Sequence, residues 1–329
     1  MNLNPFAYRL PAPSELFRRF MPQAQVPPMV SGPKTPKATS VTPLALSLAA
    51  ATARSQPVLN FVSSQVTAVP FSSSSSLALP PRPANAPSGS AFFASIGKLK
   101  GAAREDAILQ QILSGNVPEH QRRFKELTIQ AKGADGQSRT ATVRALPDYL
   151  AIGSSSDYVL VPMTPLTAQK IADATGSSLP TRKLVNEIYT RSEVKLAPRP
   201  KPPGAVMMST GYFAEHSETI RKQRLSAGAS DGQLIGGHKK DVVISNRLSQ
   251  KPGTVAIYGW HQPNGKPIQP LSTIHEDTYS DYSHGVRLIG GSVRVDGVER
   301  PIAEVLADPN LAPLLSDEGP IRQPRVKLQ

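Results

Sequence analysis

The chain has 329 residues, no cysteine and a formal net charge of +13. The lack of cysteine excludes a disulfide framework, a thiolate zinc site, an iron–sulfur cluster and a cysteine nucleophile. No apolar run approaches the roughly 18 to 20 residues that a membrane-spanning helix needs, so we expect no transmembrane span.

The positive charge is concentrated in the first third of the sequence. Residues 1–100 contain nine basic residues and one acidic residue, Glu15, which gives +8, whereas the remaining 229 residues carry only +5. A domain that binds nucleic acid concentrates Lys and Arg on a folded face. Because the excess charge lies in a proline-rich segment instead, we expect no nucleic-acid partner.

Residues 1–105 are predicted to form a disordered leader or linker. Fifteen of the 33 prolines fall within the first 100 residues, together with a run of serines at 72–76. A segment of this composition buries too little apolar surface to offset the entropy cost of ordering it. The Pro/Ser-rich N-terminal third is therefore expected to precede the folded part.

This leader also contains a candidate export signal at residues 29–53. Two lysines precede the apolar stretch 43–50, and an Ala-Thr-Ala sequence follows it. That order is typical of a secretory signal, provided that translation starts at Met29 rather than Met1. The acid-poor N-terminus is also typical of transit peptides and of the leaders of injected bacterial effectors. We expect a protein that is secreted, periplasmic or injected into a host, with a cytoplasmic protein as the alternative.

From about residue 106 the pattern becomes globular and predicts an α+β lobe over 106–197. Turn and capping residues mark the ends of its elements, for example Thr164 followed by a proline and Asp135 followed by a glycine. The expected elements are a helix at 107–113, a hairpin of 124–132 and 138–146, strands at 149–152 and 158–162, and helices at 165–175 and from 181 to 189.

A proline-rich connector at 198–203 predicts a boundary before a second α+β lobe at 204–329. Its expected elements are a helix at 212–225, a glycine-rich loop at 226–237, strands at 241–245, 254–260, 285–289, 292–295 and 298–302, and short helices at 302–307 and 311–315. Consecutive strands joined by tight turns favour an α+β fold: a mixed, mainly antiparallel sheet with flanking short helices.

Histidines cluster in this second lobe. Five of the six lie between His216 and His284, together with the only tryptophan. Imidazole is the side chain that changes charge near neutral pH, and it is the commonest metal ligand. The clustering predicts one polar site, at which a histidine acts as a general base that a carboxylate orients. The candidate catalytic residues are His238, Asp241, Asp281 and His284.

A zinc site is the second interpretation of the same cluster. His261, His275 and His284 are the candidate ligands of Zn²⁺, and an open position would hold a hydrolytic water. The three are far apart in sequence, so a metal site requires that the fold brings them together. The alternative is that these histidines pair with one another and with nearby backbone in a polar core.

Two functions follow from these observations. The first is an exported hydrolase that acts on an amide, ester or glycosidic bond of an extracellular or cell-wall polymer, or of a protein. Its candidate substrate contacts are Tyr258, Trp260, Tyr279 and Arg221. The alternative is a non-catalytic secreted or injected effector that presents Tyr258, Trp260, Tyr279 and Tyr282 as a binding face, because such aromatic residues often anchor interfaces. The pattern leaves the oligomeric state open.

Overall fold

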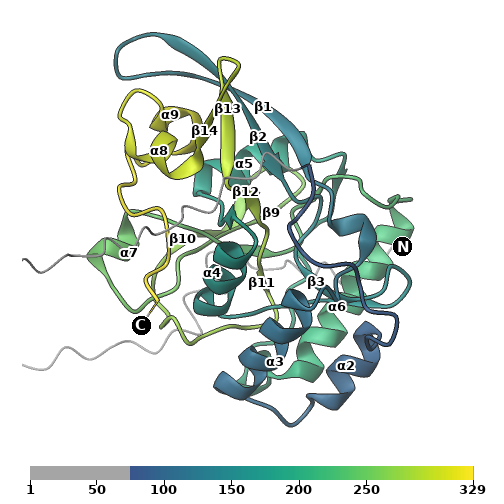
Figure 1. The fold of residues 1–329 in the computed structure, drawn as a ribbon. Helices are drawn as coiled ribbons and strands as arrows, with labels where there is room; N and C mark the ends of the chain where they lie inside the picture. Colours follow the sequence, from purple (N-terminus) through teal and green to yellow (C-terminus); the bar gives the residue numbers. More distant parts are fainter. Residues whose placement is uncertain (1–74, 329) are drawn as a thin grey trace, which may run out of the picture. The chain divides into compact units, whose positions relative to one another are not determined.

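The computed structural model describes residues 75–328, which form helices and mainly antiparallel sheet (Figure 1). This confirms the α+β class that the sequence predicts. Within these residues no helix is both long enough and apolar enough to cross a membrane.

The elements of residues 75–328 have the following bounds. The helices are α2 (Gly89–Ser95), α3 (Gly101–Leu113), α4 (Pro165–Ala174), α5 (Arg182–Arg191), α6 (Thr210–Ser226), α7 (Arg247–Gln250), α8 (Ile302–Ala307) and α9 (Ala312–Leu315), with 3-10 turns η1 (Glu119–Gln121) and η2 (Ala205–Met208). The strands are β1 (Lys125–Lys132), β2 (Ser138–Ala145), β3 (Ala151–Gly153), β4 (Tyr158–Leu160), β5 (Ser177–Ser178), β6 (Val194–Lys195), β7 (Ile235–Gly236), β8 (Lys240–Val242), β9 (Ile257–His261), β10 (Pro267–Ser272), β11 (His284–Gly285), β12 (Ile289–Gly290), β13 (Ser292–Val295) and β14 (Val298–Pro301).

Two larger sheets organise the fold. The first has six strands, in the order β14-β13-β2-β12-β5 with β1 also paired to β2, and all of its pairs are antiparallel. The second has four strands in the order β10-β9-β8-β11, of which only β8 and β11 are parallel. Two further strand pairs, β3–β4 and β6–β7, lie outside these sheets.

The predicted hairpin is confirmed as β1–β2, the long two-stranded ribbon in Figure 1. Its register runs without a break from Lys125 opposite Ala145 to Lys132 opposite Ser138. Apolar side chains alternate inward along both strands, and Gly136 supplies the positive φ of 79° that the turn requires.

The predicted helix starts at Thr164 and Thr181 are also confirmed. Each threonine side chain accepts a hydrogen bond from a backbone N–H of the first turn, at the N-termini of α4 and α5 respectively. Such a cap satisfies a donor that would otherwise have no partner within the helix. The cap at Thr181 fixes where α5 begins, and therefore which of its side chains face the cleft described below.

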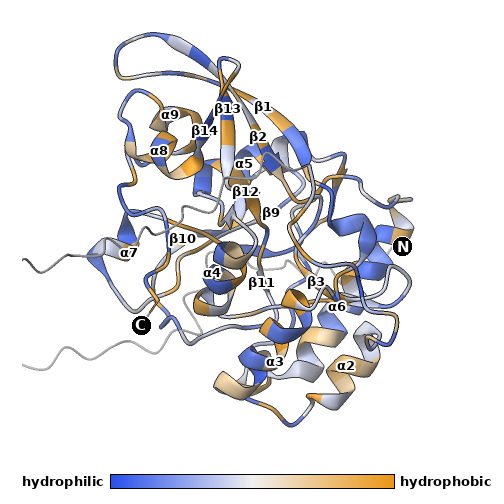
Figure 2. Cartoon of the chain, in the orientation of Figure 1, coloured by the Kyte–Doolittle hydropathy of each residue, from blue (hydrophilic) through white to orange (hydrophobic). Residues whose placement is uncertain are grey.

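The predicted leader, residues 1–105, is too long at its C-terminal end. Residues 75–105 belong to the folded part. Leu77, Phe92, Phe93 and Ile96 are buried, and α2 packs against α6 and β4. Figure 2 shows α3 with both hydrophobic and hydrophilic residues, as expected for a helix that buries one face, and α2 in hydrophobic to nearly neutral colours. The prediction of disorder gave weight to the prolines of this region and overlooked its short apolar pattern. The rest of the expected leader, including the candidate signal at 29–53, lies outside the described residues.

The division into two lobes at 198–203 is wrong as well. Strand β2 from the first expected lobe pairs with β12 and β13 from the second, so one sheet is built from both. Contacts join the described residues into a single compact unit. The connector does lack regular secondary structure, as its prolines predict, but it packs on the fold: the Lys201 N–H donates to the Tyr282 hydroxyl at 2.7 Å.

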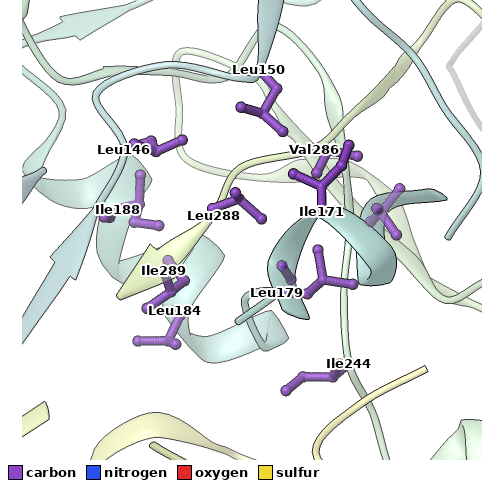
Figure 3. Close-up of a cluster of buried hydrophobic side chains, with 14 of the residues drawn as sticks. Leu146, Leu150, Ile171, Leu179, Leu184, Ile188, Ile244, Val286, Leu288 and Ile289 are labelled. Atoms are coloured by element: carbon purple, nitrogen blue, oxygen red, sulfur yellow. The ribbon is translucent and has the colours of Figure 1, made fainter. Parts of the chain in front are cut away.

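The core also unites the two expected lobes. Buried aliphatic side chains from α4, α5, the segment after β2 and the segment before β12 pack together (Figure 3). The side chains that the figure labels are Leu146, Leu150, Ile171, Leu179, Leu184, Ile188, Ile244, Val286, Leu288 and Ile289. This core holds the segment 146–150 beside 285–289, which positions the polar residues described next.

We predict that α2 stabilises the fold. Phe92→Ala should lower the free energy of unfolding of the full chain by about 3–5 kcal/mol, since it leaves a cavity at a buried aromatic side chain. Leu99→Ala, at a side chain that is 37% exposed, should change it by no more than about 0.5 kcal/mol. Urea unfolding followed by far-UV circular dichroism measures both. Equal effects of the two substitutions would show that α2 does not pack as described.

Candidate functional site

The histidines of the predicted common site lie in different surroundings. His238 contacts Asp148, His261 contacts Asn186, and His275 and His284 share a contact with Tyr279. The remaining member, His216, contacts Lys239. The structure therefore does not bring all five rings to one place, although His275 and His284 share the neighbourhood of Tyr279.

The predicted zinc ligands are not assembled. His275 and His284 flank Tyr279, whereas the Nε2 of His261 lies 2.9 Å from the Asn186 Oδ1. Among residues 75–328 no three His, Asp or Glu side chains are placed so that they could hold a metal ion. The three histidines come from a strand end, a loop and a short parallel strand.

His238 belongs to a buried ion network. Its Nε2 lies 2.9 Å from Asp148 Oδ1, and the Arg224 guanidinium donates to the other oxygen of Asp148. Burial acts to raise the pKa of Asp148, but His238 and Arg224 together hold it well below its ordinary value. Only 1% of His238, which was predicted to be catalytic, is exposed, and its contact with Asp148 links α6 to the segment before β8.

Asp281 and His284, predicted to act together, do lie in one cluster. Tyr279 donates its hydroxyl hydrogen to Asp281 Oδ2 at 2.9 Å, and its ring stacks on exposed His275 with centroids 4.1 Å apart. The backbone N–H of Ser283 donates to Asp281 Oδ1 at 2.7 Å. Burial lowers the pKa of His284 to about 4. Since the His284 ring is fully buried, it cannot touch a substrate in this conformation.

An open cleft of about 420 Å³ lies elsewhere, between α5 and the end of β9. Its size falls in the range of small-molecule sites. One wall comes from α5, where side chains three and four residues apart share a face. The residues that line the cleft are Asn186, Tyr189, Thr190, Lys195, Tyr258, His261, Pro263, Asn264, Gly265 and Pro267.

His261 is held rigidly at this cleft. Only 3% of the residue is exposed, but its Nδ1, unlike the Nδ1 of the two other buried candidate histidines, is not enclosed by the protein. Its ring stacks on Tyr189, with centroids 4.5 Å apart and planes 15° apart. The Asn186 Oδ1 accepts hydrogen bonds from the Tyr258 hydroxyl and from His261 Nε2, both at 2.9 Å. Because an amide oxygen only accepts, His261 Nε2 carries the hydrogen and Nδ1 keeps its lone pair. Burial lowers the pKa of His261 to about 4, so the ring is neutral at pH 7.

A small polar cavity of about 10 Å³ adjoins the cleft, and His261 and Tyr189 line both. On the cavity side lies Asp241, whose Oδ2 accepts a hydrogen bond of 2.8 Å from the Tyr149 hydroxyl. The fully buried guanidinium of Arg287 lies over the Tyr149 ring, 4.5 Å from its centroid. Burial raises the pKa of Asp241 to about 7.

Gly259 makes this arrangement possible. Its φ of 109° lies in the region that favours glycine. A Cβ at this position would lie 3.3 Å from Asp241 Oδ2 and 3.6 Å from His261 Cε1. Glycine therefore lets the strand backbone run close to both polar side chains. Trp260, which follows it, also has a positive φ, of 56°.

The predicted substrate contacts are divided among several places. Tyr258 lines the cleft, whereas Trp260 is only 4% exposed and Tyr279 lies in the Asp281 cluster. Arg221 lines a different groove and binds Glu218 through two hydrogen bonds of 2.6 and 2.8 Å. Tyr282, like Tyr258 and Trp260, is mostly buried. The proposed aromatic binding face is therefore not present as an exposed surface.

Sequence reasoning missed Asn186, Tyr189 and Lys195. A lone amide, a tyrosine and a lysine carry no motif. One signal could have found two of them. Thr181 marks the start of a helix, and Asn186 and Tyr189 are three residues apart within that helix, so they share a face. Tyr149 and Arg287 were missed for the same reason.

Comparisons with protein-family models, with curated proteins and with solved structures gave no match. The functional argument for this chain therefore rests on the chemistry of its own residues.

The buried carboxyl of Asp241 predicts a pH-dependent stability. With a pKa of about 7 when folded and 3.8 otherwise, it binds a proton that the unfolded chain has already lost between these pH values. Its contribution to stability therefore falls as the pH rises from 4 to 7. Asp241→Asn removes this loss and keeps an acceptor for Tyr149. The stability of the variant relative to wild type should rise between pH 4 and pH 8, by up to about 4 kcal/mol.

Urea unfolding at a series of pH values measures this difference. Asp281→Asn is the matched control with the opposite sign, because Asp281 has a lowered pKa despite its burial. Its variant should lose stability relative to wild type as the pH rises to the unfolded pKa of 3.8, and this loss should stay constant at higher pH, so the series extends below pH 4. A pH-independent difference for Asp241→Asn would contradict the raised pKa of Asp241.

Proposed function

We propose that this protein is a hydrolase that cleaves an amide or ester bond in the cleft, with His261 as the general base. The observation that carries the proposal is the orientation of His261. Asn186 fixes its tautomer, Tyr189 fixes its plane, and its neutral Nδ1 has a lone pair. A histidine that a third group orients in this way is the arrangement that acid–base catalysis requires.

In the proposed reaction a water molecule is the nucleophile. His261 Nδ1 takes a proton from the water as it attacks the carbonyl carbon, and the resulting imidazolium returns the proton to the leaving group. The Asn186 oxygen stabilises the imidazolium by accepting from Nε2. Among the described residues no serine lines the cleft, which favours water over a serine nucleophile.

The composition of the cleft favours an acyl bond over a glycosidic bond. Glycoside hydrolysis commonly needs two carboxyl groups on either side of the scissile bond. Among residues 75–328 no Asp or Glu lines the cleft, and Asp241 reaches only the adjoining cavity. We therefore narrow the expected substrates to amides and esters, in an extracellular polymer or a protein. Export remains a proposal that depends on the leader sequence.

A non-catalytic binding protein is the second candidate. The specific observation in its favour is that both tyrosine hydroxyl groups at the cleft already donate within the protein, Tyr189 to the Gln262 carbonyl and Tyr258 to Asn186. Two fixed tyrosines would form rigid walls for a ligand that is bound and not turned over.

The test is hydrolysis of p-nitrophenyl acetate by the purified full chain. His261→Gln should lower kcat/KM by about 10²–10⁴, the usual contribution of a general base. His275→Gln is the matched control, since this exposed histidine lies outside the cleft lining. It should keep the wild-type rate.

Circular dichroism of each variant checks that it is folded. Equal rates for His261→Gln and wild type, or no hydrolysis above the buffer rate by wild type, would contradict the hydrolase and favour the binding protein.

A further inference from the structure

The cleft has an uncompensated positive charge. Lys195, on β6, is the one cleft-lining side chain among the described residues that is charged at neutral pH. Its ammonium group lies over the Tyr189 ring, 5.3 Å from the centroid, and makes no ion pair within residues 75–328. The aromatic face holds the lysine at the cleft without neutralising it.

The nearest carboxylates in sequence are already paired. Glu193 lies 3.5 Å from the Lys125 ammonium and accepts a hydrogen bond from the Leu234 N–H at 2.7 Å. Glu187 pairs with Arg191 one turn along α5. Neither is free to neutralise Lys195, so the charge of this lysine remains available to a ligand.

A second donor faces the same space. The Asn186 oxygen already accepts from both Tyr258 and His261, so its orientation is fixed. Asn186 lines the cleft, and no residue within 75–328 accepts a hydrogen bond from its amide NH₂. An ammonium group and an unpaired amide therefore border one space, in which no described carboxylate lies.

The groove that Arg221 lines differs on this point. Arg221, which the sequence predicts to be a substrate contact, is neutralised by Glu218 through two hydrogen bonds. Its neighbour Arg224 is neutralised by buried Asp148. Lys195, in contrast, lines its cleft without an ion pair to any described carboxylate.

From these contacts we propose that the cleft binds a carboxylate group of its substrate, through Lys195 and the Asn186 amide. The inference rests on the proposed hydrolase and specifies its substrate class: an acyl bond with a carboxylate nearby, as at the acidic end of a peptide or in a half-ester. Charge-assisted hydrogen bonds of this kind are stronger than neutral ones and give specificity for an anionic group.

The first experiment compares two esters that share a leaving group, p-nitrophenyl acetate and p-nitrophenyl hydrogen succinate. Wild type should prefer the succinate in kcat/KM by about tenfold, which corresponds to one charge-assisted hydrogen bond in a partly exposed site. Lys195→Met should remove this preference, and Lys195→Arg should keep most of it. Lys170→Met removes an equal charge from exposed helix surface and should leave the ratio as in wild type.

A preference that is absent in wild type, or that persists in Lys195→Met, would overturn the carboxylate site while His261-dependent hydrolysis of acetate could still hold. If neither ester is hydrolysed, the proposed hydrolase activity is contradicted, and a direct binding measurement tests the carboxylate site. Monomethyl succinate, titrated into the full chain and followed by NMR, should shift signals of cleft residues in wild type and much less in Lys195→Met. No shift in wild type would overturn the site.

Discussion

The placement of segment 146–150 against 285–289 is the constraint on which the polar interior depends. The Leu146 N–H donates to the Leu288 carbonyl and the Leu150 N–H to the Val286 carbonyl, so residues about 140 positions apart run side by side. Arg287 strengthens this pairing because its guanidinium donates to the Leu146 carbonyl. The pairing places Tyr149 next to Asp241. The Asp241 carboxyl is buried there, and this burial raises its pKa.

The interior then holds several polar groups, many of which have hydrogen-bond partners, whereas both ring nitrogens of His284 have none among the described residues. Lys239 is an example: its ammonium group is buried, donates to the Tyr282 carbonyl and meets His216 Nδ1. Burial lowers the pKa of Lys239 to about 7 and that of His216 to about 2. Such groups cost free energy to bury, and hydrogen bonds offset that cost. The sequence marks these histidines as catalytic candidates because imidazole is polar and titrates near neutral pH. For the same reason most of them pair with other buried polar groups, which is a structural role.

Local signals predicted most elements because turns and caps are local. The caps at Thr164 and Thr181 and the Asp135-Gly136 turn each depend on two or three neighbouring residues. Strand β10 was missed because Pro267 and Pro270 argue against a strand, although an edge strand tolerates them. The site was predicted only in part: Asp241, Tyr258 and His261 were selected, but their grouping with Asn186 depends on packing between α5 and β9, which no sequence spacing encodes.

Trp260 gives the chain a built-in optical probe. It is the single indole of the protein, it is 4% exposed, and the Lys240 ammonium lies 5.2 Å from its ring centroid. Indole emission depends on the polarity and charge around the ring. Indole emission from this protein therefore reports on one location, the end of β9 beside Lys239 and Lys240. A shift in the indole emission wavelength that precedes the loss of helical circular dichroism would reveal that the surroundings of Trp260 open while the rest of the molecule stays folded.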